Sequence, residues 1–129
     1  STPPLASAPA MPPGGLAPRM WIYIAEEGQR EAAQALEARL RGVRISDAAL
    51  ELPGIVLVKA APTRTMLRCF RPEECRQDGE ALAGTVNALL HAPTLTLEDF
   101  SALYGSNTAI RARHYELWFA AGAIELSGR

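Results

Sequence analysis

A short run of alternating side chains, followed at once by a helical pattern, most constrains what this chain can fold into. In the segment MWIYI, Met20, Ile22 and Ile24 alternate with Trp21 and Tyr23. A period of two in β-branched and aromatic residues predicts a β-strand with two different faces. The next segment, EEGQREAAQALEARLRG, places alanine and leucine on one stripe and ends in glycine, as an amphipathic helix does. The folded part of the chain is therefore predicted to open with a strand–helix unit.

A second strand–helix unit follows further along the chain. The segment TRTMLRCF predicts a strand over residues 65–70, and Pro72, Glu73 and Glu74 suit the first turn of a helix. The apolar positions of that helix recur every three or four residues, which places them on one face: Cys75, Gly79, Leu82, Val86 and Leu89. Both helices are thus expected to pack an apolar stripe against a sheet.

The order of elements predicts the fold class. Strands are also expected over residues 55–59, 94–100 and 113–120, which gives strand, helix, strand, strand, helix, strand and one further strand. A chain of 129 residues can bury one core. Two helices on one face of a small, mostly antiparallel sheet would bury both stripes economically. We therefore predict an α+β fold, ferredoxin-like βαββαβ with an extra C-terminal strand.

The N-terminal segment differs from the rest in composition. Residues 1–19 hold six of the ten prolines and are otherwise rich in alanine, serine and glycine. Such a segment predicts a linker, either a plain disordered terminus or a tether to a membrane anchor or another domain. Residues 20–129 are expected to form a single domain.

The net charge and the hydropathy of the chain argue against two classes of partner. A net charge of −1 does not favour binding to nucleic acid, and no apolar run reaches the ~18–20 residues needed to span a bilayer.

Both cysteines of the chain lie where the third predicted strand meets the second helix. If Leu67 faces the helices, Cys69 does too, and Cys75 lies on the inward stripe of the helix. Both sulfurs would then point to one corner of the core, within reach of a disulfide. Three interpretations stay open: two free structural thiols, a disulfide, or a reactive thiol at a helix N-terminus. No metal site is expected, because His91 and His114 are distant in sequence and zinc takes four ligands.

Other patterns of catalytic residues are missing from the sequence. There is no glycine-rich phosphate loop, no G-x-S-x-G and no H-E-x-x-H. The adjacent pairs Glu26/Glu27 and Glu73/Glu74 should diverge, whereas an acid/base pair must converge. The two histidines are expected at the surface or as caps. We therefore predict a domain that is not an enzyme and that has no catalytic residues and no cofactor.

The candidate binding site is the side of the sheet that the helices leave open. Trp21 and Tyr23 should face that side, and so should Arg68 and Phe70 on the third strand. On the last strand Trp118 alternates with its apolar neighbours, and either set could face outward. Rings and guanidinium planes stack on flat ligands and on sugars, so these residues predict a binding surface.

A second interpretation of this side of the sheet needs no ligand. The segment from Phe100 to Tyr115, a further domain or a second chain could cover the same aromatic side chains. Exposed aromatic residues in a monomer usually have a partner of some such kind. The sequence leaves both interpretations open.

Two segments of the chain carry a resemblance to a known family. In their order of elements, IYIAEEGQREAAQALEARLRG and MLRCFRPEECRQDGEALAGTVNALL resemble the SPOR domain and the related LytR C-terminal domain, over about residues 20–100. SPOR domains bind denuded peptidoglycan glycan strands on the open face of the sheet. The resemblance implies a glycan site at Trp21, Tyr23, Arg68 and Phe70.

Two functions follow from these observations. The first is a binding module of the cell envelope or periplasm that holds peptidoglycan glycan and does not itself insert into a membrane. The alternative is an accessory domain of a larger signalling or enzymatic protein, periplasmic or cytoplasmic, that uses the same face for protein contacts. The alternative predicts stable complexes, a homodimer among them.

Overall fold

The computed structural model describes residues 16–104, 107 and 109–128 of the chain. Residues 1–15 of the predicted linker lie outside these residues. Its last four residues belong to the fold: Arg19 opens strand β1 (Arg19–Ile24), and the Glu51 amide donates to the carbonyl of Pro18 at 2.8 Å. The Arg113 guanidinium donates to the carbonyl of Leu16 at 3.1 Å. The folded unit thus takes in residues 16–19, which the sequence had assigned to the linker.

A five-stranded mixed sheet forms the centre of the fold. Its strands run in the order β4 (Ile55–Leu57), β1, β8 (His114–Trp118), β5 (Met66–Cys69) and β7 (Thr96–Asp99). Two small pairs of strands accompany it in the described part of the chain: β2 (Arg44–Ile45) with β3 (Ala48–Ala49), and β6 (Leu90–Ala92) with β9 (Glu125–Leu126). The pairs were not expected from the sequence, because runs of two or three residues show no clear period.

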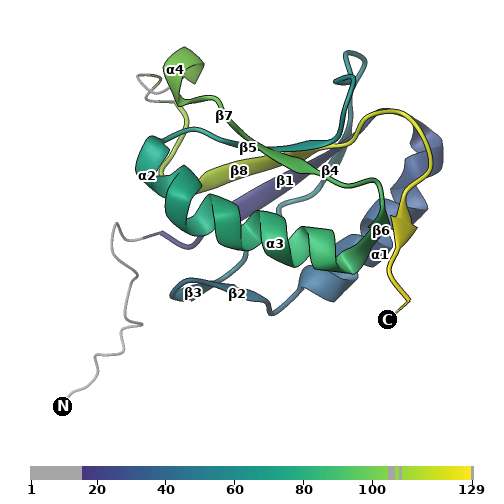
Figure 1. Cartoon of the computed structure of the whole chain (residues 1–129), viewed down its shortest axis with the longest axis horizontal. Coiled ribbons are helices and arrows are strands. Elements are labelled where there is room, and N and C mark those ends of the chain that lie inside the picture. Colours follow the sequence, from purple (N-terminus) through teal and green to yellow (C-terminus); the bar gives the residue numbers. More distant parts are fainter. Residues whose placement is uncertain (1–15, 105–106, 108, 129) are drawn as a thin grey trace.

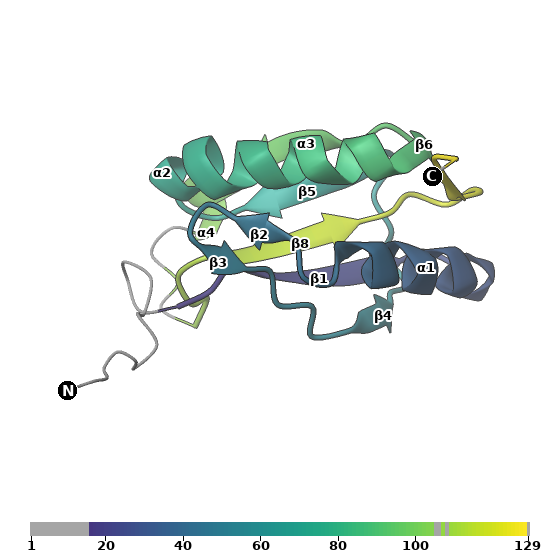
Figure 2. The ribbon, with the colours of Figure 1, turned by 90° about the horizontal axis from the view of Figure 1, so that it is seen from below.

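The helices lie mainly on one side of this sheet. A 3₁₀ turn (Glu27–Gln29) leads into α1 (Arg30–Leu40), and α2 (Pro72–Glu74) continues through a π-helical turn (Cys75–Gly79) into α3 (Glu80–Leu89). Figures 1 and 2 show α1 and α3 on the same side of the sheet, while the short helix α4 (Ser101–Tyr104) rises on the other side. The prediction of helices packed on one face of a sheet is therefore confirmed at this level.

The predicted ferredoxin-like arrangement is not confirmed, and the prediction of a mostly antiparallel sheet is wrong. β1 pairs in parallel with both β4 and β8, β5 pairs in parallel with β7, and β5 and β8 are antiparallel. In each half a helix connects two parallel strands that pair directly, whereas a ferredoxin-like split βαβ unit has another strand between them. Strand β8, the last of the five strands in the chain, fills the centre of the sheet and joins the two halves. The sheet is thus mixed, and it is not mostly antiparallel.

The core lies between the sheet and the two long helices. Met20, Ile22 and Ile24 are fully buried, as their alternation predicted, while Trp21 and Tyr23 are only partly buried. Other residues of the core include Ala33, Leu36, Leu40, Leu67, Cys69, Leu82, Val86, Tyr115, Leu117 and Phe119. This burial decides the question left open for β8, because Leu117 and Phe119 face the helices and Trp118 faces the other way.

A buried glutamine fixes where the first helix begins. The Oε1 atom of Gln29 accepts hydrogen bonds from the amides of Ala25 and Glu26, at 2.7 and 3.2 Å. Its Nε2 atom donates to the carbonyls of Ala120 and Gly122, both at 2.8 Å. One side chain therefore joins the end of β1, the start of α1 and the segment after β8.

Among the described residues, no helix is both long enough and apolar enough to cross a membrane.

Candidate binding face

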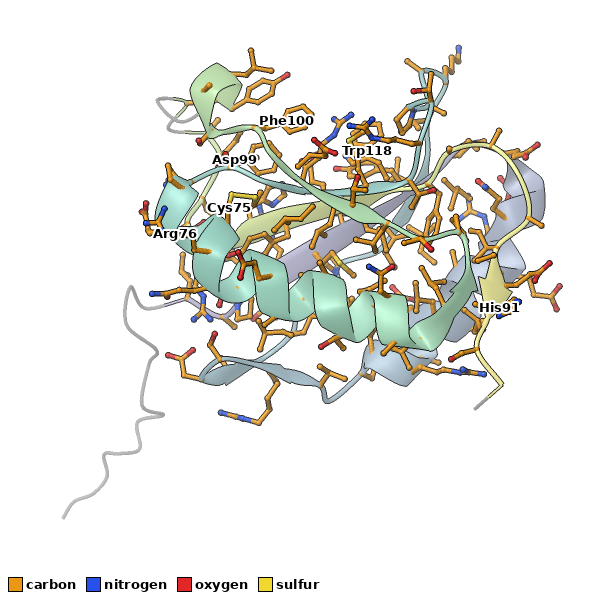
Figure 3. All side chains as sticks on the ribbon, in the orientation of Figure 1. Cys75, Arg76, His91, Asp99, Phe100 and Trp118 are labelled. Atoms are coloured by element: carbon orange, nitrogen blue, oxygen red, sulfur yellow. A yellow bond between two sulfur atoms is a disulfide. The ribbon has the colours of Figure 1, made fainter. Side chains whose placement is uncertain are left out.

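Four of the five predicted binding residues lie together on the side of the sheet away from α1 and α3. Tyr23 pairs with Trp118 across β1 and β8, and Arg68 pairs with Glu116 across β5 and β8. Trp21, Tyr23, Arg68 and Trp118 are all half-buried. Figure 3 shows Trp118 and Phe100 above the sheet, on the side opposite α3. The sheet register thus brings together aromatic residues that are far apart in sequence.

These side chains form a continuous layer, which we call the aromatic layer: Tyr23, Trp118, Arg68 and Phe100. The rings of Tyr23 and Trp118 are stacked, with centroids 4.3 Å apart and an angle of 19° between their planes. The guanidinium carbon of Arg68 lies 4.1 Å from the Trp118 centroid and 4.5 Å from the Phe100 centroid. Each cation–π contact of this kind contributes ~0.5–2 kcal/mol. The layer is therefore held in place before any ligand binds.

Phe70 does not offer its ring to a ligand. It lies on the same side of the sheet but is only 4% exposed. Its ring centroid lies 6.2 Å from that of Phe100, 5.8 Å from Tyr104 and 5.6 Å from His114. The prediction that Phe70 contributes an exposed ring to this face is therefore wrong, because the segment around α4 covers the end of the face where Phe70 lies. The same segment leaves Trp21, Tyr23 and Trp118 partly exposed.

A row of polar side chains supports the aromatic layer along β8. The Nε–H of Arg19 donates to Nδ1 of His114 at 3.1 Å, which leaves Nε2 of the ring for a second contact. That nitrogen lies 2.7 Å from Oε2 of Glu116, whose other oxygen accepts from the Trp118 indole at 2.9 Å. His114 is thus buried rather than at the surface as expected. The alternation H-x-E-x-W, which places all three side chains on one face of a strand, was the signal for this row.

Two ionisable groups of this face have shifted pKa values. Burial alone would raise the pKa of Glu116, but hydrogen bonds from His114 and Trp118 outweigh it and lower that pKa below its ordinary value. Burial raises the pKa of Tyr23, and the charge of Glu116 adds to the effect. At neutral pH the face therefore presents a carboxylate already held by its neighbours and a tyrosine hydroxyl that keeps its proton. The Tyr23 hydroxyl has no hydrogen-bond partner among the described residues and can donate to a ligand.

The two cysteines form a disulfide. Cys69, at the end of β5, is bonded to Cys75 in the π-helical turn, with their Cα atoms 5.4 Å apart. Both are buried, as predicted from their inward positions. Of the three interpretations that the sequence left open, the disulfide is the correct one. Neither sulfur is therefore a thiolate that could take part in catalysis. Asp99 offers a carboxylate near both sulfurs, within 4.8 Å (Figure 3), but bonded sulfurs do not bind a metal as thiolates do.

Replacing both cysteines should weaken the domain without changing its fold. We expect Cys69→Ser with Cys75→Ser to lower the free energy of unfolding by about 2 kcal/mol, the low end of the usual range, because a bridge across a short loop removes less entropy from the unfolded chain. A urea melt beside the oxidised wild type measures the loss, and wild type in a reductant is the matched comparison. A folded double variant that has lost all binding activity would instead give the disulfide a direct functional role.

An ionic cluster on the other side of the sheet was missed by the sequence analysis. The Arg113 guanidinium donates to both oxygens of Asp78, at 2.7 and 3.0 Å, and to Asp47 at 2.9 Å. Asp78 also accepts from the hydroxyls of Tyr115 and Ser46, at 2.8 and 2.9 Å. Ser46, Asp47, Asp78 and Arg113 help to line a hollow of about 200 Å³. Because the cluster's charged groups already bind one another, we assign it to stability.

Comparison with protein-family models, with curated proteins and with solved structures finds no match for this chain. The similarity to the SPOR and LytR C-terminal domains therefore stays a prediction from the sequence.

Proposed function

We propose that this domain is a non-catalytic binding module that holds a glycan on the aromatic layer. The observation that carries the proposal is the continuous stack of Tyr23, Trp118, Arg68 and Phe100 on the side of the sheet without long helices. Sugar rings have an apolar face, which packs on aromatic rings, and an edge of hydroxyl groups, which hydrogen bonds to polar neighbours. Trp21 and the Tyr23 hydroxyl supply one further ring and one donor at the same surface.

The shape of this side suits an extended chain of sugars. Figure 1 shows that α4 and the segment between β4 and β5 rise above the sheet at its two ends. Figure 3 shows Phe100 and Trp118, two members of the aromatic layer, between these segments. An extended polymer can lie along such a face without entering a deep pocket. Peptidoglycan glycan is the ligand that the resemblance to SPOR domains implies.

The disulfide supports a location in the cell envelope. Disulfides form and persist in oxidising compartments such as the periplasm and are rare in the cytosol. The Cys69–Cys75 bridge is buried, and it holds β5, which carries Arg68, against the helix beneath it. A periplasmic or cell-envelope module is therefore the proposed setting.

Trp21→Ala tests the proposal. We expect this variant to lose binding to purified peptidoglycan in a pull-down, because an interface aromatic contributes ~2 kcal/mol or more. Its urea midpoint should fall only slightly, since Trp21 is half-buried on the aromatic side and not part of the core.

The matched control is Glu31→Ala, an exposed position on α1 on the opposite side of the sheet. It should leave both binding and stability unchanged. A large fall in midpoint for Trp21→Ala, or glycan binding that Trp21→Ala leaves intact, would contradict the proposal.

One observation favours the alternative, an accessory domain that contacts another protein. Leu103 and Tyr104 on α4 are 73% and 42% exposed, next to the aromatic layer. Exposed apolar side chains of this size at one corner fit a protein contact. If the alternative holds, Leu103→Ala weakens a protein complex, and peptidoglycan retains neither the variant nor the wild type.

A further inference from the structure

The two edges of the central sheet differ in character. The outer strand β7 contains the acidic residues Glu98 and Asp99, which protect an edge against unwanted pairing. The other outer strand, β4, has the sequence Ile-Val-Leu and no charge. Figure 2 shows β4 as the outermost strand on its side. Val56 and Leu57 in this strand are 37% and 47% exposed.

The main chain of β4 is arranged to pair with another strand. The Gly54 carbonyl accepts from the Ile22 amide at 3.1 Å, and the Val58 amide donates to the Ile24 carbonyl at 3.0 Å. Because these groups alternate along a strand, Val56 also faces β1, and Ile55 and Leu57 point their amides and carbonyls away from the sheet. The edge thus offers two donors and two acceptors in an apolar setting.

We infer that two copies of this chain pair through β4, antiparallel, about a two-fold axis at Val56. In that register Ile55 of each copy lies opposite Leu57 of the other, and their outward main-chain groups form four hydrogen bonds. Val56 meets its own counterpart on the aromatic side, and Leu57 packs on Ile55 of the other copy on the helical side. The same surface serves both copies, as a two-fold interface requires.

Charges at the two ends of the edge agree with this pairing. Glu51 precedes β4 and Lys59 follows it, and both are exposed. An antiparallel pair centred on Val56 places Lys59 of one copy opposite Pro53 of the other, two residues from Glu51, whose carboxylate also lies 3.6 Å from the Arg111 guanidinium of its own chain. A parallel pairing would instead bring like charges together. The contact is small, so the dimer is weak and depends on protein concentration.

The pairing has a consequence for ligand binding. A two-fold axis perpendicular to the sheet keeps the two aromatic layers on the same side of one continuous sheet. Two such layers could hold one polymer at two points, which raises the overall affinity without new contacts. This consequence rests on the proposed function, whereas the dimer itself does not.

Sedimentation equilibrium on the purified chain tests the dimer. We expect dimers to form between about 1 μM and about 1 mM, and Leu57→Lys to weaken the association ~10-fold or more by adding a charge to the edge. The matched control is Thr96→Lys, an exposed position on the opposite edge, which should dimerise like wild type. A thermal melt of each variant confirms that it is folded.

A cross-linking experiment tests the register directly. Residues directly opposite each other in a pair without mutual hydrogen bonds have Cα atoms about 4.5 Å apart, within the range of a disulfide. Val56→Cys should therefore form a covalent dimer under mild oxidation, whereas Leu57→Cys should not, because Leu57 of one copy lies diagonally from Leu57 of the other.

Two results would overturn the inference. One is a wild type that stays monomeric over the whole concentration range, which would leave the edge to an extended segment of another protein. The other is a dimer that Leu57→Lys does not weaken and that cross-links equally at both cysteine positions. Neither result bears on whether the aromatic layer binds glycan, which the Trp21→Ala pull-down tests separately.

Discussion

Asp78→Asn should lower the free energy of unfolding by about 3–5 kcal/mol, the usual cost of removing one partner of a buried ion pair. Asp78 is buried and binds the Arg113 guanidinium through both oxygens. Asparagine keeps the size of the side chain but cannot neutralise the arginine. Arg113 would then retain Asp47, at 2.9 Å, whose side chain is much more exposed than that of Asp78.

The position of this cluster explains why the effect is large. Arg113 and Ser46 both have a positive φ, 60° and 59°, which side-chain-bearing residues rarely adopt. Both residues bind Asp78, which itself lies in the π-helical turn. One carboxylate thus holds together the β2–β3 turn, the second helical segment and the start of β8. Denaturant unfolding measures the loss, and Glu73→Gln on the exposed side of the same helical segment is the control.

The same carboxylate makes stability depend on pH. Burial alone would raise the pKa of Asp78, but hydrogen bonds from Arg113, Tyr115 and Ser46 outweigh it and lower that pKa below its ordinary value. A carboxyl group whose pKa is lower in the folded state stabilises the fold above its unfolded pKa and loses that contribution as pH falls through its folded pKa. Wild type should therefore lose stability as the pH falls below about 4. Asp78→Asn should show a smaller fall over the same range, and an equal fall would contradict this assignment.

The local pattern of the sequence was sufficient to predict the two faces of β1, although it left those of β8 open. Alternation in β1 placed Met20, Ile22 and Ile24 in the core and Trp21 and Tyr23 outside it. A period of two says which residues share a face, but not which strand lies next to which. The parallel pairing of β1 with β4 and with β8 depends on how crossovers return the chain to the sheet, and no local pattern records that.

The candidate site was predicted in part for the same reason. Tyr23, Arg68 and Trp118 share one face of the sheet as expected, but they meet only because β8 lies between β1 and β5. Phe70 has the same alternation but is buried, because α4 brings Phe100 and Tyr104 over it. The pairing of Arg113 with Asp78 joins residues 35 positions apart and has no periodic signal. Neither the covering of Phe70 nor the pairing of Arg113 with Asp78 could be predicted from the sequence, because each contact joins residues far apart in the chain.

Trp118→Ala should have the largest effect on ligand binding. The Trp118 side chain stacks on Tyr23, lies 4.1 Å from the Arg68 guanidinium and donates to Glu116. Its removal deletes the central ring of the aromatic layer, and Tyr23 and Arg68 lose the ring against which they pack. We expect peptidoglycan binding to fall by about 30-fold or more, as for a central hot-spot aromatic. Stability should fall by roughly 2 kcal/mol, less than for a buried tryptophan because Trp118 is half-buried.

Trp118→Phe separates the ring from its hydrogen bond. Phenylalanine keeps a ring to stack on Tyr23 but cannot donate to Glu116, so binding should fall only a few-fold if stacking carries the affinity. Binding isotherms on purified glycan, with a urea melt of each variant, measure both quantities. If Trp118→Phe binds as weakly as Trp118→Ala, the hydrogen bond to Glu116 matters more than the ring. If both variants bind like wild type, the aromatic layer is not the ligand site.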